Sequence, residues 1–117
     1  MRKRSELPGS LRLGYLTYRI VEWPQSEARA SGRYGETDVP HQIIRIQVEG
    51  RLQAAVAETL LHEIMHCIFF SWNICKDDSE ERVVTAVGLG LATAMASNKA
   101  VFEWIAAQLH RDERNTK

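Results

Sequence analysis

The order of its predicted elements places this 117-residue chain in the α+β class. Two β-prone stretches lie in the first half, and three helical stretches fill the second half. Strands followed by helices favour a small N-terminal sheet packed on helices over an alternating β–α arrangement. Hydrophobic residues make up 44% of the sequence, which suits one core in a domain of this length. We expect a single domain over residues 1–117, with flexible tails at 1–10 and 112–117.

The first β-prone stretch covers residues 11–23 and is predicted to form one strand. Leu11, Leu13 and Tyr15 alternate with polar or small residues, as they do when one face of a strand is buried. Pro24 cannot donate a backbone hydrogen bond in a sheet, so the strand is expected to end before it.

The second β-prone stretch follows a polar segment. Residues 25–37 are rich in Ser and Gly and predict a loop around a short strand at 33–34, and residues 38–40 predict a turn. A strand is then expected over 42–49, closed by Gly50. Its residues on one face are Ile44, Ile46 and Val48.

Three helices are predicted in the second half. The central helix runs from 52 to 74 or 75, because residues 51–76 contain no Gly or Pro and carry an apolar stripe at helical spacing. Residues 76–79 interrupt it with side chains that favour helix capping, and a second helix follows over 80–96. A third helix is expected over 99–111. Its buried side is predicted to hold Phe102, Ile105, Ala106 and Leu109.

The central helix contains a His-Glu-x-x-His motif at His62, Glu63 and His66. Residues four apart lie on the same side of a helix, so the two imidazoles can bind one metal ion. Glu63 lies beside the pair and can act as the general base, as in zinc peptidases. The alternative is an amphipathic helix with two hydrogen-bonded histidines and one exposed glutamate. We prefer the metal because the three polar residues group on one side, away from the apolar stripe.

A catalytic zinc usually has a third protein ligand, and carboxylates are the candidates here. Asp77, Asp78, Glu80 and Glu81 cluster where the second predicted helix begins. Gly88, in the middle of that helix, suggests close contact with the central helix, and Glu81 shares its face. We expect Glu81 as the third ligand and Glu80 as the second choice. Helix capping also explains these carboxylates without a metal, with Asp78 as the N-cap and Glu81 at the third helical position.

The motif and its surroundings resemble small phage and prophage zinc metallopeptidases of the ImmA/IrrE type. The similar segments are Leu60 to His66, Glu80-Glu81-Arg82-Val83-Val84 with Gly88-Leu89, and, upstream, Tyr34-Gly35 and residues 42–46. The resemblance covers residues 11–105, and His-Glu-x-x-His is its specific motif. It implies a minimal zincin-like domain of the gluzincin kind, with Zn²⁺ as the cofactor.

The expected reaction is hydrolysis of a peptide bond in a protein or peptide substrate. Zinc would lower the pKa of its bound water toward about 7, and Glu63 would carry the proton to the leaving amine. The strand at 42–49 could pair with an extended substrate if it lies at a sheet edge. Tyr34 could stabilise the oxyanion, although a tyrosine beside a glycine also suits simple packing.

Composition narrows the location and the partners. Fifteen basic and fifteen acidic residues cancel, so nothing favours nucleic acid or a membrane surface as a partner. No stretch approaches the roughly 18 apolar residues of a membrane span. Cys67 and Cys75 lie about 12 Å apart along one predicted helix, which is too far for a disulfide and fits a cytoplasmic protein.

Two other functions are compatible with the same motif. The chain could be a zinc-binding interaction protein of phage origin that binds a repressor or host factor without cleaving it. It could also hydrolyse a non-peptide substrate. Glu63 favours the peptidase, because a binding protein has no chemical need for a base beside the metal. The sequence does not indicate an oligomeric state.

Overall fold

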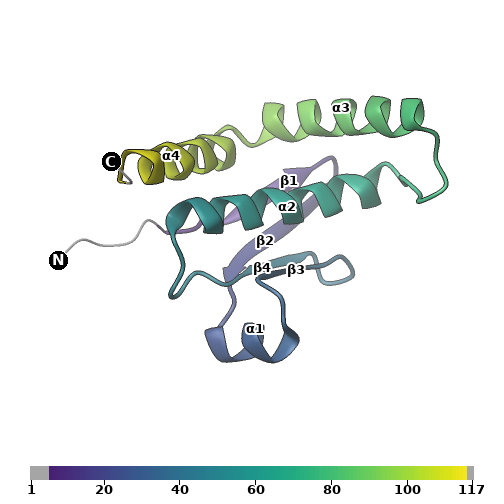
Figure 1. The fold of residues 1–117 in the computed structure, drawn as a ribbon. Coiled ribbons are helices and arrows are strands. Elements are labelled where there is room, and N and C mark those ends of the chain that lie inside the picture. The colour runs from purple at the N-terminus through teal and green to yellow at the C-terminus, as the bar shows by residue number, and fades with distance from the viewer. Residues whose placement is uncertain (1–5, 116–117) are drawn as a thin grey trace.

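The computed structural model describes residues 6–115 and confirms the α+β class (Figure 1). Within these residues, one four-stranded sheet packs against helices that follow it in the chain. The strands are β1 (Ser10–Leu13), β2 (Leu16–Glu22), β3 (Gly35–Asp38) and β4 (Ile43–Ile46). The helices are α1 (Gln25–Ser31), α2 (Gln53–Ser71), α3 (Glu80–Ser97) and α4 (Lys99–Asn115).

The sheet is mixed, and its strand order is β1-β2-β4-β3. β2 pairs with β4 in parallel, whereas the two outer pairs are antiparallel. β4 is therefore an interior strand, and β1 and β3 form the two edges. Pairing of a substrate with residues 42–49 required an edge position, and this condition is not met, because β2 and β3 pair with the two sides of β4.

The predicted strand over 11–23 is a hairpin of two strands. Leu13 pairs with Leu16, so Gly14 and Tyr15 form a two-residue turn. Gly14 has a φ of 66°, which glycine adopts without strain at the first position of a tight hairpin turn. The apolar alternation continues through the turn, which is why the sequence pattern did not separate the two strands.

The segment predicted as a loop over 25–37 contains a helix. α1 buries a single side chain, Ala28, so its sequence has no apolar stripe that would predict a helix. The helix ends at Gly32, whose left-handed φ of 76° lets its N–H bond the carbonyls of Ala28 and Arg29. The strand expected at 33–34 begins two residues later, at Gly35.

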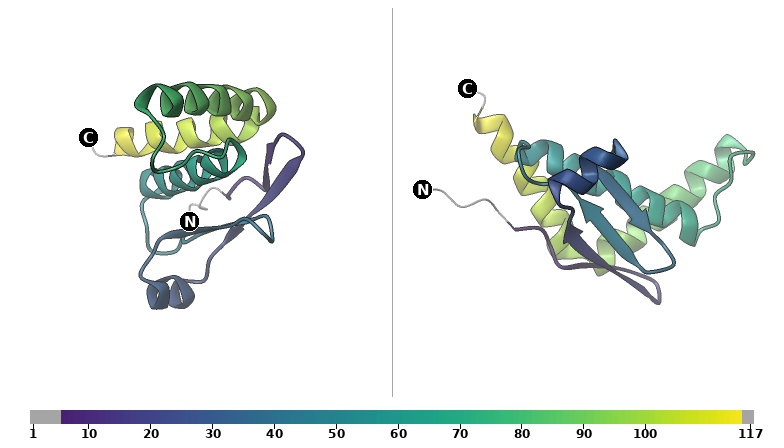
Figure 2. Two further views of the ribbon diagram at one scale, coloured as in Figure 1. Left: turned by 90° about the vertical axis from the view of Figure 1, so that its right-hand side faces the viewer. Right: turned by 90° about the horizontal axis from the view of Figure 1, so that it is seen from below.

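Helix α2 is the centre of the core, between the sheet and α4 (Figure 2). The strand predicted over 42–49 is shorter, since β4 spans Ile43–Ile46. Its predicted core face is confirmed, because Ile44, Ile46 and, two residues after β4 ends, Val48 are all buried. α2 buries side chains toward both the sheet and the other helices, among them Val56, Leu60, Ile64 and Ile68. Such two-sided burial fixes the orientation of α2 and of any side chain on its remaining surface.

The predicted extents of the helices need two corrections. α2 ends at Ser71 rather than at 74 or 75, because Asn73 takes a left-handed conformation with φ of 51°. α4 is rotated from its predicted orientation: Leu109 is 43% exposed, and Gln108 is buried in its place. Up to residue 110, where the description of side chains ends, the other buried residues of α4 are Val101 and Ile105, while Phe102 is half-buried and Ala106 is exposed.

The predicted tails are also shorter than expected within the described residues. Ser10 starts β1, and Leu7 packs against the core. α4 continues to Asn115, so part of the predicted C-terminal tail is helical. Residues 1–5 and 116–117 lie outside the described part of the chain. Across residues 6–115, no helix combines the length and apolarity that a membrane crossing needs.

Asn98, the residue between α3 and α4, closes the middle of the β1 edge. Its Oδ1 accepts a hydrogen bond from the Arg12 N–H at 2.7 Å, and its Nδ2 donates to the Arg12 carbonyl at 2.6 Å. The same Nδ2 donates to the Ala94 carbonyl at 2.7 Å. The buried amide thus makes the two backbone hydrogen bonds that a neighbouring strand would make at this position.

α3 packs closely on α2 at Gly90, not at Gly88 as predicted. A Cβ at Gly90 would overlap the Cγ2 of Ile68 and lie 3.2 Å from Cε3 of Trp72. A Cβ at Gly88 would meet no heavy atom of the described residues within 4 Å. The glycine that lets the two helices approach is therefore Gly90.

These two glycines give a matched test of the helix packing. Gly90→Ala should lower the free energy of unfolding by about 1–3 kcal/mol, because the added methyl group overlaps a buried side chain. Gly88→Ala should raise it by up to about 1 kcal/mol, because alanine favours the helix and the position is open. Urea denaturation of both variants measures the difference. Equal effects would contradict the contact at Gly90.

Candidate functional site

Helix α2 brings His62 and His66 together on its exposed side. Their Nε2 atoms are 3.2 Å apart, with ring centroids separated by 4.9 Å and the ring planes inclined by 70°. Two imidazole nitrogens on one tetrahedral zinc lie about 3.3 Å apart, since each Zn–N bond is about 2.0–2.1 Å. The separation of the two Nε2 atoms therefore matches one edge of a tetrahedral zinc site.

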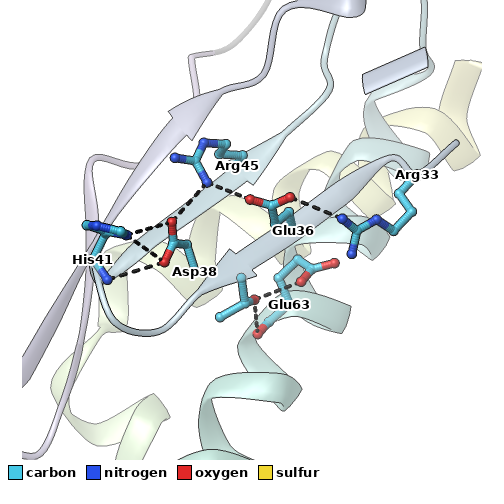
Figure 3. Close-up of polar contacts among 7 residues, drawn as sticks. Arg33, Glu36, Asp38, His41, Arg45 and Glu63 are labelled. Atoms are coloured by element: carbon cyan, nitrogen blue, oxygen red, sulfur yellow. Dashed lines mark hydrogen bonds and ion pairs between the residues drawn. The ribbon is translucent and has the colours of Figure 1, made fainter. Parts of the chain in front are cut away.

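Glu63 is buried beside this pair, contrary to the alternative of an exposed glutamate. It is 5% exposed, and the Thr37 hydroxyl donates a hydrogen bond to its Oε1 at 2.7 Å (Figure 3). The same hydroxyl lies 3.3 Å from the Glu63 carbonyl oxygen. A buried carboxylate needs such a partner, because its removal from water is costly. Thr37 therefore holds Glu63 in one orientation from the neighbouring strand β3.

Gly35 allows β3 to approach this carboxylate. A Cβ at Gly35 would lie 2.7 Å from Cγ2 of Thr59 and 2.9 Å from Oε2 of Glu63, both of which are too close for real atoms. The backbone conformation of Gly35 is ordinary, so the glycine is required for space rather than for a special φ angle. Any larger residue at position 35 would separate β3 from α2 or displace Glu63.

A cavity of about 560 Å³ opens over these groups. One wall comes from residues 33–37 and Val39, and the other from α2. The α2 wall consists of Glu58, Thr59, His62, Glu63 and His66. Two of the three predicted metal ligands, His62 and His66, and the predicted base thus share one open pocket with the edge strand. Its volume suits part of a peptide.

Charged side chains on β3 and β4 tie the edge strand to the sheet. Glu36 accepts from Arg45 Nη1 at 2.6 Å and from Arg33 at 3.1 Å (Figure 3). Asp38 lies 3.0 Å from Nδ1 of His41 and 3.5 Å from Arg45. The hydrogen bond from His41, with a smaller contribution from Arg45, lowers the pKa of Asp38. Partly exposed pairs of this kind contribute little stability each, and here they fix the register of β3 on β4.

Tyr34 reaches the pocket from the residue before β3. Its ring is stacked by the guanidinium of Arg51, with Cζ of Arg51 4.1 Å from the ring centroid. Burial lowers the pKa of Arg51, and the nearby Tyr34 and Glu58 oppose this, so the group stays a cation at neutral pH. The sequence suggested Tyr34 as a candidate but gave no sign of its contact with Arg51.

The structure does not bring Glu81 or Glu80 to the histidines. Among residues 6–110, whose side chains are described, no three His, Cys, Asp or Glu side chains are grouped so that they could hold a metal. Glu81 lies nine residues before Gly90, which is about 180° around the helix, so it points away from α2. The packing argument for Glu81 failed because it took Gly88 as the contact with α2.

The start of α3 has a different role. Ser79 is the N-cap, and its Oγ accepts from the Arg82 N–H at 3.2 Å, so the predicted cap at Asp78 is off by one residue. Arg82 donates to the carbonyls of Trp72 and Asn73 at 2.9 and 3.0 Å. This arginine therefore joins the first turn of α3 to the C-terminal end of α2.

Cys67 belongs to the core below the pocket. It is fully buried and does not line the cavity. Burial raises the pKa of its thiol to about 12, and burial likewise raises the pKa of the neighbouring Tyr18 to about 12. Neither group ionises near neutral pH, so neither is an activated nucleophile.

Comparison with known proteins identifies no relative of this chain. No protein-family model matches the chain, and neither the curated proteins nor the solved structures give a significant match.

Gly35→Ala tests the contact between β3 and α2. We expect the free energy of unfolding to fall by about 1–3 kcal/mol, because the new methyl group overlaps Thr59 and the Glu63 carboxylate. Gly9→Ala is the control, since no described atom lies within 4 Å of a Cβ at that position. Urea denaturation measures both changes, and an unchanged Gly35→Ala variant would rule out the close approach.

Thr37→Val tests the support of Glu63. Valine keeps the shape of threonine but removes the hydroxyl donor, so the buried carboxylate loses its hydrogen bond. A loss of about 1–3 kcal/mol in the free energy of unfolding is expected. Thr17→Val, at an exposed position on β2, should change stability far less. Similar changes in the two variants would mean that the Thr37 hydroxyl does not stabilise Glu63.

Proposed function

We propose that this chain is a zinc-dependent peptidase in which His62 and His66 bind the metal and Glu63 is the general base. The observation that supports it best is the pairing of the two Nε2 atoms, 3.2 Å apart, with the buried carboxylate of Glu63 on the same helix. Burying a carboxylate costs free energy, and a helix with no catalytic role has no need to bear that cost beside an open pocket.

The pocket offers two suitable zinc ligands, His62 and His66. Imidazole nitrogens are preferred zinc ligands, and both face the cavity. When bound, zinc supplies a Lewis acid that polarises a carbonyl group and activates water at neutral pH. Glu81, with Glu80 as the alternative, stays our prediction for a third ligand, although neither is near the pair in this structure.

Glu63 carries the proton in the proposed reaction. Thr37 fixes its Oε1 and leaves Oε2 to take the proton of the attacking water. The same carboxyl group then gives the proton to the leaving amine, so that the base is regenerated. The fixed orientation matters because a proton is transferred only over hydrogen-bond distance.

The open edge of β3 is the proposed binding place for the substrate backbone. The Gln47 N–H, one residue after β4, donates to the carbonyl of Tyr34, one residue before β3, at 2.8 Å, so the carbonyl of residue 34 faces the β4 side. In an antiparallel ladder the roles alternate, and the backbone groups of Gly35 and Thr37 therefore point to the open edge. An extended peptide that adds to this edge lies along the wall of the pocket. This replaces the interior strand β4 as the proposed substrate strand.

The same features support a minimal zincin-like fold and a relationship to the ImmA/IrrE type, as the sequence resemblance implies. A short edge strand runs beside a helix that carries the metal-binding histidines, and the rest of the domain supports these two elements. Cys67 and Cys75 are free thiols, which supports our proposal of a cytoplasmic protein of phage or prophage type.

A second candidate is a zinc-binding interaction protein that does not cleave its partner. The separation of Glu80 and Glu81 from the histidines favours it, because two protein ligands bind zinc more weakly than three. Glu63 favours the peptidase, since binding alone needs no base. Metal content and cleavage, measured on the same samples, separate the two functions.

The experiment measures zinc by mass spectrometry and cleavage of an unfolded protein substrate. Wild type should hold about one zinc per chain, and Glu63→Gln should keep zinc but lose activity by about 10²–10⁴-fold. Glu27→Gln, an exposed change on α1, is the control and should alter neither quantity.

Loss of zinc in Glu81→Ala or in Glu80→Ala would identify the third ligand. Zinc without cleavage in wild type would favour the interaction protein. The absence of zinc from every sample prepared without chelator would overturn both proposals.

A further inference from the structure

Tyr34 is an exposed aromatic residue held in a fixed place at the pocket. It is 60% exposed, yet it lines the same cavity as His62 and His66. Its carbonyl accepts the Gln47 N–H, so its backbone is held at the end of the β3–β4 ladder. Exposed tyrosines normally move between rotamers, and a tyrosine that must meet a substrate benefits from being restrained.

Arg51 provides that restraint. Its Nη1 donates to the Gln47 carbonyl at 2.9 Å, and its Nη2 donates to the Ala55 carbonyl at 3.2 Å and to the Thr59 hydroxyl at 2.9 Å. These three bonds fix the plane of the guanidinium, and the plane covers one face of the Tyr34 ring. A planar cation can stack on an aromatic ring while its edge donates hydrogen bonds, which lysine cannot do.

Two of these acceptors belong to the first turns of α2. The helix that carries His62, Glu63 and His66 therefore also fixes Arg51, and Arg51 fixes Tyr34. The ring and the histidines are held by one rigid element, although Tyr34 lies on a separate segment of the chain. An exposed ring that served only for packing would not need a guanidinium fixed by three hydrogen bonds beside it.

We infer that Tyr34 is a catalytic residue that contacts the substrate and that Arg51 is its positioning residue. The inference rests on the proposed peptidase function. The phenol O–H donates a hydrogen bond to the carbonyl oxygen of the bond being cleaved, where negative charge develops. Arg51 acts only through Tyr34, by holding the ring over the pocket.

The first test is a double-mutant cycle on kcat and KM. Tyr34→Phe removes the phenol and should lower kcat about 100-fold with little change in KM. Arg51→Met should have a similar effect, and the double variant should be no worse than either single variant. Arg51→Lys keeps the charge but not the stacked plane and should recover only part of the activity.

The controls separate catalysis from folding. Tyr15→Phe changes a tyrosine on the β1–β2 turn, and Arg29→Met changes an exposed arginine on α1, so both should keep full activity. Zinc content and melting temperature are measured on every variant. If Arg51→Met does not fold, Arg51→Lys supplies the comparison. Additive losses in the double variant would overturn the positioning role of Arg51, and an active Tyr34→Phe would overturn the catalytic role of Tyr34.

The second test does not depend on activity. In protein labelled with ¹³C at the tyrosine rings, Tyr34→Phe assigns the Tyr34 signals. Arg51→Met should shift those signals and remove the contacts between the ring and the arginine side chain, whereas Arg29→Met should not. If wild type cleaves no protein but the signals respond in this way, the peptidase proposal fails while the contact stands. An unchanged Tyr34 spectrum in Arg51→Met would overturn the inference, even if the chain is a peptidase.

Discussion

The close contact between strand β3 and helix α2 is the constraint on which the rest of the structure depends. At this contact Gly35 leaves room for the Glu63 carboxylate, and Thr37 supplies the hydrogen bond that makes its burial tolerable. The surrounding elements keep the two segments in place. β4 holds β3 through the ladder and the ion pairs of Glu36 and Asp38 with Arg45, while α4 packs along α2. A shift of β3 by one residue would replace Gly35 with a side chain and close the site.

In the proposed function, the support of the general base and the binding of the substrate backbone both fall to the short strand β3. The inward side chains of β3 hold Glu63, and its outward backbone groups are left for a partner in extended conformation. The two histidines need less support, because four-residue spacing on a helix already brings them together. Glu63 needs the strand, since a helix position alone would leave a glutamate free to turn to the solvent. The histidine pair is thus determined by local sequence, whereas the placement of Glu63 depends on the folded sheet.

This division explains how much the sequence could predict. The α+β class, the strand that carries Ile44 and Ile46, the central helix and the pairing of His62 with His66 all follow from local periodicity, and the structure agrees with them. The turn at Gly14, helix α1 and the interior position of β4 depend on contacts between distant segments, and the sequence pattern did not reveal them. The argument for Glu81 failed for a related reason. A helix rich in small residues offers more than one possible contact face, and only packing selected Gly90 over Gly88.

The two edges of the sheet differ in a way that affects how copies of this chain can associate. The amide of Asn98 already occupies the backbone groups of Arg12 on β1, whereas no strand of the described residues pairs with the outer edge of β3. A sheet with two open edges can add neighbours on both sides and grow into a fibre. Where the backbone groups of one edge are already bonded, a further strand adds more readily at the other edge. Asn98 therefore makes the β1 edge a poorer template for a further strand than the β3 edge.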